Sequence, residues 1–237
     1  YRALLCWALD DGAKLCDLLG EKGHAAKCNA IAGRLKKQIK QPNRLKQAAA
    51  LMAVAGLMEP ERACDEIISV GGAKDFSTFY GYYMLQALAK AGEYQQALDI
   101  IRQYWGGMLD LGATTFWEDF NLDWSRNAAR LDDFVPEGKD DIHGDFGDYC
   151  YPGFRHSFCH GWASGPTPWM TRHVLGIEVL DAGCKTIRVN PHLGDLEWAE
   201  GTYPTPLGVI YVKHVKKDGG NVVSTVKAPD GIKVVSK

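Results

Sequence analysis

The chain has 237 residues, of which 46% are hydrophobic and 24% are charged, and this composition excludes an intrinsically disordered protein. The 27 lysine and arginine residues nearly balance the 29 aspartate and glutamate residues, leaving a formal net charge of −2. We therefore expect neither nucleic acid nor an anionic membrane as a partner. The longest apolar runs, such as residues 48–57, are shorter than the roughly 20 residues that span a bilayer.

The cysteine pattern predicts free thiols. The seven cysteines are an odd number without a CxxC pair, so we expect buried thiols and neither a disulfide framework nor a zinc knuckle. They are Cys6, Cys16, Cys28, Cys64, Cys150, Cys159 and Cys184. The chain opens at Tyr1 inside a helical pattern, with neither an initiator methionine nor a secretion signal, so we expect a piece of a longer protein.

Helices are predicted for the first half of the chain, because apolar residues recur at helical spacing from residue 1 to about residue 111. Breaks near Gly20, Pro42, Pro60, Gly72 and Gly92 divide this stretch into about six helices. The short connections between them favour antiparallel neighbours.

Two of these segments are expected to be strongly buried. Residues 94–108 carry an apolar stripe opposite charged and amide side chains, which predicts one buried side. Residues 76–91 are apolar or aromatic nearly all round, which predicts an inner helix packed on several sides.

Helical periodicity fails between residues 111 and 158, where Gly, Asp and aromatic residues are frequent. A long loop rich in Trp and Tyr is typical of an ordered, functional segment. A further helix is predicted over residues 164–175, because prolines stand near its start and Gly176 follows its end.

Short β-like runs separated by turn residues follow Gly176. The expected strands cover residues 185–189, 195–199, 208–216, 221–227 and 232–235. Asp218-Gly219-Gly220 predicts a hairpin between the third and the fourth strand. The predicted organisation is a mainly α domain over residues 1–178, with about seven helices, followed by a small antiparallel β domain over residues 179–237.

Glu118 is the strongest local candidate for chemistry. It has several aromatic neighbours in the sequence, namely Phe116, Trp117, Phe120 and Trp124. Desolvation beside such rings disfavours the charged form of a carboxyl group and suits it to proton transfer. Rings beside carboxylates also hold sugars, since a ring stacks on the apolar face of a pyranose while acids bond its hydroxyl groups. The alternative is a loop carboxylate that only caps or pairs.

The histidines raise a metal hypothesis. His156 and His160 are four residues apart and, with Cys159 or His143, would be zinc ligands if they shared a helix face. A glycine follows His160 directly and the sequence has no tight ligand pair elsewhere, so we expect a satisfied, hydrogen-bonding histidine in a polar pocket. The acidic segment 132–148 lacks the alternating spacing of a calcium loop, and nucleotide-binding motifs are absent from the sequence. We therefore expect no metal and no cofactor.

Residues 112–120 (GATTFWEDF) and 156–169 (HSFCHGWASGPTPW) resemble, in this order, two blocks of the bacterial α-L-rhamnosidases, glycoside hydrolase family 78. Residues 104–110 (YWGGMLD) look like the helix that leads to the family's site. Short motifs after Gly176 are similar to the family's C-terminal β domain, at residues 187–191, 194–199 and 205–208. The resemblance spans nearly the whole chain.

This resemblance implies an (α/α)6 toroid followed by a β-sandwich domain, and an inverting glycosidase that releases terminal α-L-rhamnose from rhamnosides or polysaccharides. Inversion uses an acid that protonates the leaving oxygen and a base that activates water, with carboxyl groups roughly 6.5–9.5 Å apart. The family pattern gives the role of general base to Glu118 and that of a sugar-binding histidine to His160. The candidate substrate-binding residues are Trp117, Asp119, Trp124, His160 and Trp162.

The family's general acid has no counterpart in this sequence. A complete toroid has twelve helices, so the chain resembles the second half of the barrel plus the β domain. We expect the chain alone to be inactive on rhamnosides, and its exposed half-barrel faces to form a homo-oligomer. The loop over residues 121–149 is long for the family, so the subsites are expected to differ.

Three alternatives stay open. Another toroidal carbohydrate hydrolase, acting on a different terminal sugar or on rhamnose-containing pectin, would have the same fold. A non-catalytic carbohydrate-binding or helical scaffold protein would use Glu118 only to bond hydroxyl groups, and a metalloprotein would use His156 and His160. The compartment is not decided by the sequence, because free thiols favour a reducing compartment and the family favours the periplasm or secretion.

Overall fold

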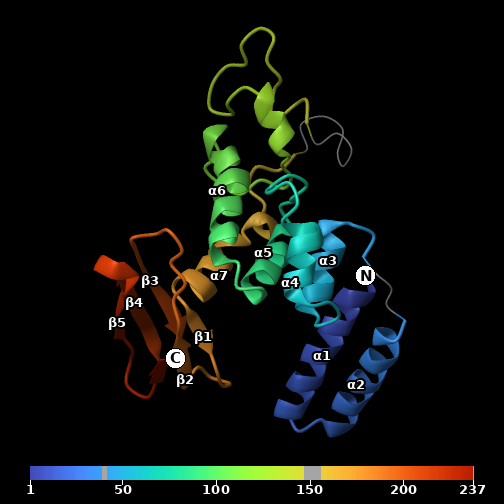
Figure 1. Ribbon diagram of the computed structural model, residues 1–237, viewed down its shortest axis with the longest axis vertical. Coiled ribbons are helices and arrows are strands. Elements are labelled where there is room, and N and C mark those ends of the chain that lie inside the picture. Colours follow the sequence, from blue (N-terminus) through green and yellow to red (C-terminus); the bar gives the residue numbers. More distant parts are fainter. Residues whose placement is uncertain (39–41, 147–155, 237) are drawn as a thin grey trace.

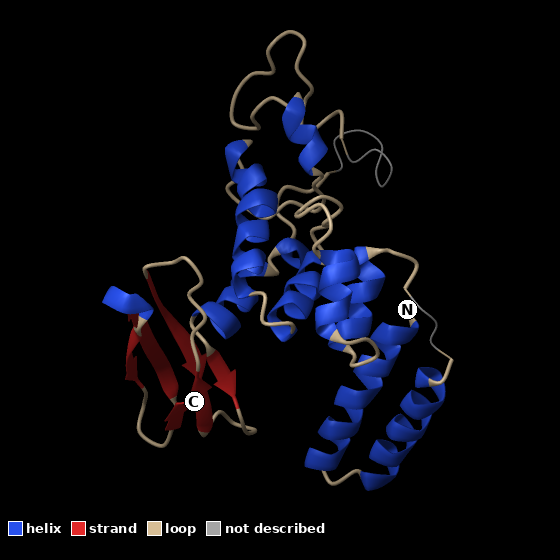
Figure 2. Ribbon diagram, viewed as in Figure 1, coloured by secondary structure: helices blue, strands red, loops and turns tan. Residues whose placement is uncertain are grey.

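The computed structural model describes residues 1–38, 42–146 and 156–236, and every contact below concerns these residues. Figure 1 shows three parts around a central group of helices. These parts are the hairpin of α1 (Arg2–Leu18) and α2 (Lys22–Lys36), a lobe of strands, and a loop region beyond the end of α6 (Tyr94–Asp110). The strands are confined to one lobe, as Figure 2 shows.

The described residues form seven α-helices, as the sequence predicts. Besides α1, α2 and α6, these are α3 (Lys46–Val54), α4 (Pro60–Ala63), α5 (Gly81–Lys90) and α7 (Pro166–Trp169). Two π-helical turns extend α4 and α7, over Cys64–Ile68 and Met170–Val174. The prediction of about six helices before residue 111 is thus confirmed.

The helix ends follow the chemistry of their turn residues. Gly92 adopts a left-handed conformation (φ 80°) after α5, and the N–H of Glu93 donates to the carbonyl of Leu88 at 2.9 Å. This six-to-one bond is the Schellman motif, which satisfies a free carbonyl at a helix end. Gly20 (φ 79°) ends α1 in the same way. Both turns bring the next helix back against the one before it.

The main core lies where α3, α5 and α6 meet. Met84, Leu85 and Leu88 on α5 are fully buried, which confirms the predicted inner helix. The helix nevertheless begins at Gly81 and not near residue 76, because residues 76–77 are irregular and residues 78–80 form a turn. Trp105 of α6 packs on this start so closely that a Cβ at Gly81 would lie 2.7 Å from its ring.

The β lobe holds two three-stranded sheets. The first has the order β1-β2-β6, with β1 (Ile177–Val179), β2 (Thr186–Val189) and β6 (Lys233–Ser236). The second has the order β3-β4-β5, with β3 (Trp198–Thr205), β4 (Gly208–Lys216) and β5 (Val222–Lys227). Ile187 of the first sheet and Val212 of the second belong to one buried cluster, so the sheets share a hydrophobic core.

The predicted hairpin around Asp218–Gly220 is confirmed, since β4 and β5 pair antiparallel on either side of it. The prediction of a purely antiparallel unit is wrong, because β6 pairs parallel with β2. The chain leaves the second sheet after β5 and returns to the first sheet beside β2, which no local pattern reveals.

β3 also differs from its prediction, since it covers Trp198–Thr205 and not residues 195–199. Gly201 and Pro204 argue against a strand in the sequence. The position of β3 at a sheet edge tolerates Pro204, because one side of its backbone has no partner strand in the sheet. Gly201 leaves room for Leu175, whose Cδ1 would lie 2.5 Å from a Cβ at this position.

The thiol prediction is confirmed only in part. Cys6 and Cys64 are buried, and burial raises the pKa of the Cys64 thiol to about 12. Cys159 is exposed, so the expectation of a buried thiol is wrong for it, because it lies in a surface loop. The six described cysteines are free, and Cys150 lies outside the described residues.

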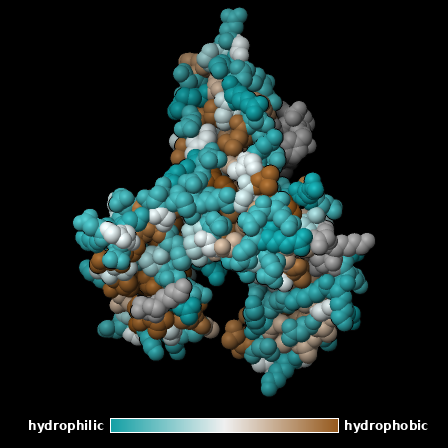
Figure 3. All heavy atoms as spheres, viewed as in Figure 1, coloured by the Kyte–Doolittle hydropathy of each residue, from teal (hydrophilic) through white to brown (hydrophobic). Residues whose placement is uncertain are grey.

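Figure 3 shows hydrophobic atoms at the surface of the strand lobe and of the α1–α2 hairpin. On α1 and the turn after it, Leu15, Leu18 and Leu19 keep 57%, 71% and 69% of their surface exposed. None of the described helices is long and apolar enough to cross a bilayer.

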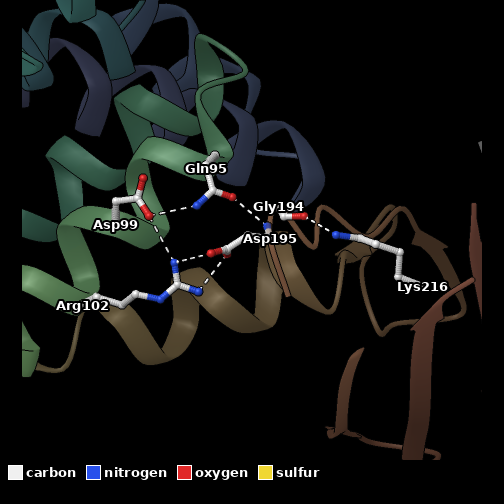
Figure 4. A network of polar contacts seen from close by, with 6 residues as sticks. All are labelled: Gln95, Asp99, Arg102, Gly194, Asp195 and Lys216. Atoms are coloured by element: carbon white, nitrogen blue, oxygen red, sulfur yellow. Dashed lines mark hydrogen bonds and ion pairs between the residues drawn. The ribbon is translucent and has the colours of Figure 1, made fainter. Parts of the chain in front are cut away.

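A polar network joins α6 to the segment that precedes β3 (Figure 4). Arg102 donates to the carboxylate of Asp195 at 3.0 and 2.8 Å, and this pairing lowers the pKa of Asp195. The Asp195 N–H donates to Gln95 at 2.7 Å, and Lys216 donates to the carbonyl of Gly194 at 2.6 Å. Because these groups are exposed, they orient the strand lobe on α6 more than they stabilise it.

Candidate active site

The two sequence blocks around Glu118 and His160 lie side by side. The N–H of Glu118 donates to the carbonyl of Ser157 at 2.8 Å, and the N–H of His160 donates to the carbonyl of Phe116 at 2.8 Å. The Thr115 hydroxyl also donates to a carbonyl of the second block. The two blocks therefore form a short clip, which fixes Glu118 and His160 relative to each other.

The Glu118 side chain is buried, with 8% of the residue exposed. Its Oε2 accepts a hydrogen bond from the Ser157 N–H at 3.2 Å and lies 4.0 Å from Nδ1 of His160. Oε1 has no hydrogen-bond partner within the described part of the chain. One carboxylate oxygen is thus oriented by the protein, and the other can accept a proton from a water molecule or a hydroxyl group.

The backbone of Glu118 is held as firmly as its side chain. Its carbonyl accepts hydrogen bonds from the Thr78 hydroxyl and from the indole N–H of Trp162, the latter at 2.9 Å. Trp162 is 49% exposed, and its ring lies near those of His160 and Phe79, at centroid distances of 4.3 and 5.7 Å. Trp162 therefore presents an aromatic surface beside the carboxylate, the kind of surface on which a sugar ring stacks.

His156 forms hydrogen bonds with the backbone of Asp119, the residue after Glu118. Its Nε2 lies 3.1 Å from the nitrogen and 2.7 Å from the carbonyl oxygen of Asp119. His156 is 5% exposed, whereas Asp119 is half-buried. The expectation of a satisfied histidine in a polar pocket is met only at Nε2, because Nδ1 is buried without a partner among the described residues and the ring lies near Trp117, Trp124 and Phe158.

The metal hypothesis gains no support from this geometry. His156 and His160 lie in a loop and not on one helix face, and backbone groups of Asp119 occupy Nε2 of His156. Over the described ranges, no group of three or more His, Cys, Asp or Glu side chains is placed to hold an ion. Part of the acidic segment 132–148 lies outside the described residues.

The two remaining aromatic candidates, Trp117 and Trp124, are more buried than Trp162. Trp117 is completely buried and packs edge-on against Phe120 and Phe158, at centroid distances of 5.8 and 5.0 Å. Trp124 is half-buried, and one face of its ring stacks on Phe146 at 4.7 Å. Trp117 therefore supports the clip from inside, while Trp162 is the candidate with an open ring.

Sequence reasoning missed Thr78, Phe79 and Ser157 as parts of the site. Ser157 stands inside the second block, but its role depends on a backbone N–H that no residue type reveals. Thr78 and Phe79 precede α5 and reach the site only through the fold, since Thr78 lies 40 positions before Glu118.

Residues 176–235 match the family model of the bacterial alpha-L-rhamnosidase C-terminal domain. The whole chain is similar in fold to solved rhamnosidases. The family 78 rhamnosidase of Bacillus sp. GL1 has a TM-score of 0.73 and 24% identity, with 98% of this chain and 25% of that chain covered. The Streptomyces avermitilis alpha-L-rhamnosidase complexed with L-rhamnose has a TM-score of 0.74 and 21% identity, with 99% and 22% covered.

A fungal relative has the same fold in the corresponding part. The Aspergillus terreus enzyme has a TM-score of 0.75 and 18% identity, with 94% of this chain and 26% of that chain covered. The chain thus spans about a quarter of the length of these relatives. Among curated protein sequences, none matches it. The resemblance to family 78 α-L-rhamnosidases is confirmed, by the family model for the C-terminal domain and by the fold for the rest.

Proposed function

We propose that this chain, whose C-terminal domain is that of the bacterial α-L-rhamnosidases, is the C-terminal part of an inverting glycoside hydrolase that releases terminal α-L-rhamnose. The observation that carries the proposal is the position of Glu118, with one carboxylate oxygen held by Ser157 and the other without a partner among the described residues. An open Trp162 ring and His160 stand beside it.

In this proposal Glu118 is the general base. Its Oε1 takes a proton from a water molecule as that water attacks the anomeric carbon, and the Ser157 N–H keeps Oε2 in place. The His160 side chain is 31% exposed, and in the proposal it forms a hydrogen bond with a sugar hydroxyl group. Trp162 stacks on the apolar face of the sugar ring, and Asp119 is the further candidate for a hydroxyl contact.

The general acid belongs, in this proposal, to a segment upstream of the 237 residues. The chain spans about a quarter of its structural relatives, and its sequence contains no counterpart of the family's acid segment. Without an acid the leaving oxygen departs unprotonated, so we propose that the isolated chain does not hydrolyse rhamnosides. The helices over residues 1–178 would then be half of an (α/α)6 toroid, and residues 179–237 a β-sandwich domain.

A panel of nitrophenyl glycosides tests the substrate class. The longest natural polypeptide that contains these residues is expected to hydrolyse 4-nitrophenyl α-L-rhamnoside and to leave other terminal sugars largely intact. Proton NMR of the first product is expected to show the β-anomer, as inversion requires. Preference for another sugar would assign the chain to a different toroidal hydrolase, and binding without turnover would assign it to a carbohydrate-binding protein.

A further inference from the structure

The turn that precedes α5 reaches across the fold to Glu118. Ser77 organises this turn, since its hydroxyl oxygen accepts the N–H of Tyr80 at 3.2 Å and its carbonyl accepts the N–H of Gly81 at 2.8 Å. These two bonds hold the turn before α5, whose own N-cap residue is Tyr80. The turn sets the positions of Thr78 and Phe79, which stand between Ser77 and the helix.

Thr78 is only 3% exposed, and its hydroxyl group donates to the carbonyl of Glu118. The indole N–H of Trp162 donates to the same oxygen at 2.9 Å, while the Glu118 N–H donates to Ser157 at 2.8 Å. Both peptide groups that flank the Glu118 Cα are therefore held. Since these groups define the direction of the Cα–Cβ bond, they also aim the carboxylate.

The segment Thr78–Phe79, Trp162 and Glu118 all contact one another. Phe79, next to Thr78 in the chain, lies 5.7 Å from the Trp162 ring, and Trp162 and Thr78 both donate to Glu118. A shift of the Glu118 carbonyl away from Thr78 would leave a buried hydroxyl group without its partner, which is unfavourable. The arrangement therefore resists small displacements of Glu118.

We propose that Thr78 is a positioning residue for the general base, which acts by holding the Glu118 carbonyl and does not touch the substrate. This inference rests on the proposed function, because it gives Glu118 the role of base. Displacement of a reacting group by about 1 Å can lower a rate by about 10²-fold. Loss of the Thr78 hydroxyl group is therefore expected to reduce turnover and to leave sugar binding by His160 and Trp162 in place.

The test is Thr78→Val in the longest natural polypeptide that contains the chain. Valine keeps the shape of threonine and removes its donor. We expect kcat for 4-nitrophenyl α-L-rhamnoside to fall about 10-fold, with KM changed less than about 2-fold. Thr78→Ser, which keeps the hydroxyl group, is expected to retain most of kcat.

Thr171→Val is the matched control. The Thr171 hydroxyl donates to the carbonyl of Thr167 at 3.0 Å, one helical turn away in the α7 region, so its loss removes the same kind of bond elsewhere. We expect this variant to keep kcat. Circular dichroism of all variants gives the folded fraction, by which kcat is normalised.

If Thr78→Val is poorly folded, Thr78→Ala removes the same donor with a smaller side chain. We expect it to lower kcat in the same way, with KM changed less than about 2-fold. Unchanged kcat in Thr78→Val, or a rise in KM alone, would overturn the positioning role. Such a result for Thr78→Val would leave the proposed function intact if Glu118→Ala is inactive in the same experiment.

Discussion

Glu118 takes its position from partners that are far away in the sequence. The resemblance of two sequence blocks assigns Glu118 and His160 to one candidate site, and in the fold their side chains lie 4.0 Å apart. Thr78 escaped prediction because an isolated threonine carries no signal of what its hydroxyl group will meet after folding. Trp117 and Trp162 are the same residue type and both lie in segments rich in aromatic residues. One is nevertheless fully buried and the other half exposed. Burial depends on the tertiary path of the loop, which periodicity does not describe.

His173 gives the stability a pH dependence. Burial lowers the pKa of His173 from 6.5 to about 4, and nearby Arg172 and His192 contribute in the same direction. The unfolded chain therefore binds more protons than the folded chain between these two values. The contribution of neutral His173 to the free energy of unfolding is complete above pH 6.5 and is lost as the pH falls toward 4.

We expect the free energy of unfolding to fall by on the order of 1 kcal/mol between about pH 7 and pH 5 because of His173, after a discount for its partial exposure. Urea unfolding at both pH values measures this change. His173→Gln is expected to lose part of the dependence, whereas His24→Gln, in an exposed helix start, is expected to keep it. Equal pH dependence in all three proteins would contradict the assignment to His173.

Helices and turns were predicted better than strands, and the reason is the range of the interactions. The breaks at Gly20 and Gly92 are set by local backbone conformation, so residue type predicts them. The parallel pairing of β6 with β2 joins residues 186 and 233, and β3 contains a glycine and a proline that only its edge position allows. The number of helices is thus readable from the sequence, while the sheet order is not.

Gly176 joins the end of the α7 region to β1 and is expected to be intolerant of any side chain. Its φ is 68°, and a Cβ would lie 2.2 Å from the carbonyl carbon of Asn190, which is a backbone atom that cannot rotate away. Gly176→Ala is expected to reduce the free energy of unfolding by about 3 kcal/mol or more. Urea denaturation measures the loss.

Gly183 is the matched control for this change. It also has a positive φ, of 88°, but a Cβ at that position would have no neighbouring atom within 4 Å. Gly183→Ala is expected to cost only the conformational strain, about 1 kcal/mol. Equal losses for both variants would show that backbone strain, and not the contact with Asn190, makes Gly176 necessary.

Large apolar side chains are exposed on the described part of the molecule, and several of them lie on the α1–α2 hairpin. Leu15, Leu18 and Leu19 lie together at the end of α1, and all three are more than half exposed. Because the chain spans about a quarter of its structural relatives, these residues are expected to be covered in a longer polypeptide. In the isolated chain the same surface is expected to bind a second copy.

Sedimentation velocity over a range of concentrations tests this association. The isolated chain is expected to shift from monomer to larger species as its concentration rises, and Leu18→Glu is expected to weaken the shift. Phe134→Ser changes another exposed apolar residue, 94% exposed in the loop beyond α6, and is expected to have no effect. A monodisperse monomer at all concentrations would contradict the association.

The central claim is that Glu118 is the base of a rhamnosidase whose acid lies upstream. The measurement that tests it most directly is hydrolysis of 4-nitrophenyl α-L-rhamnoside by the longest natural polypeptide, by its Glu118→Ala variant and by the isolated 237 residues. We predict activity in the first protein alone, with a loss of at least about 10³-fold in the variant. Turnover by the Glu118→Ala variant at the level of the parent would contradict the claim for the base. Because 4-nitrophenolate leaves without a proton, the claim for the acid is tested with methyl α-L-rhamnoside, and its hydrolysis by the isolated chain would contradict that claim.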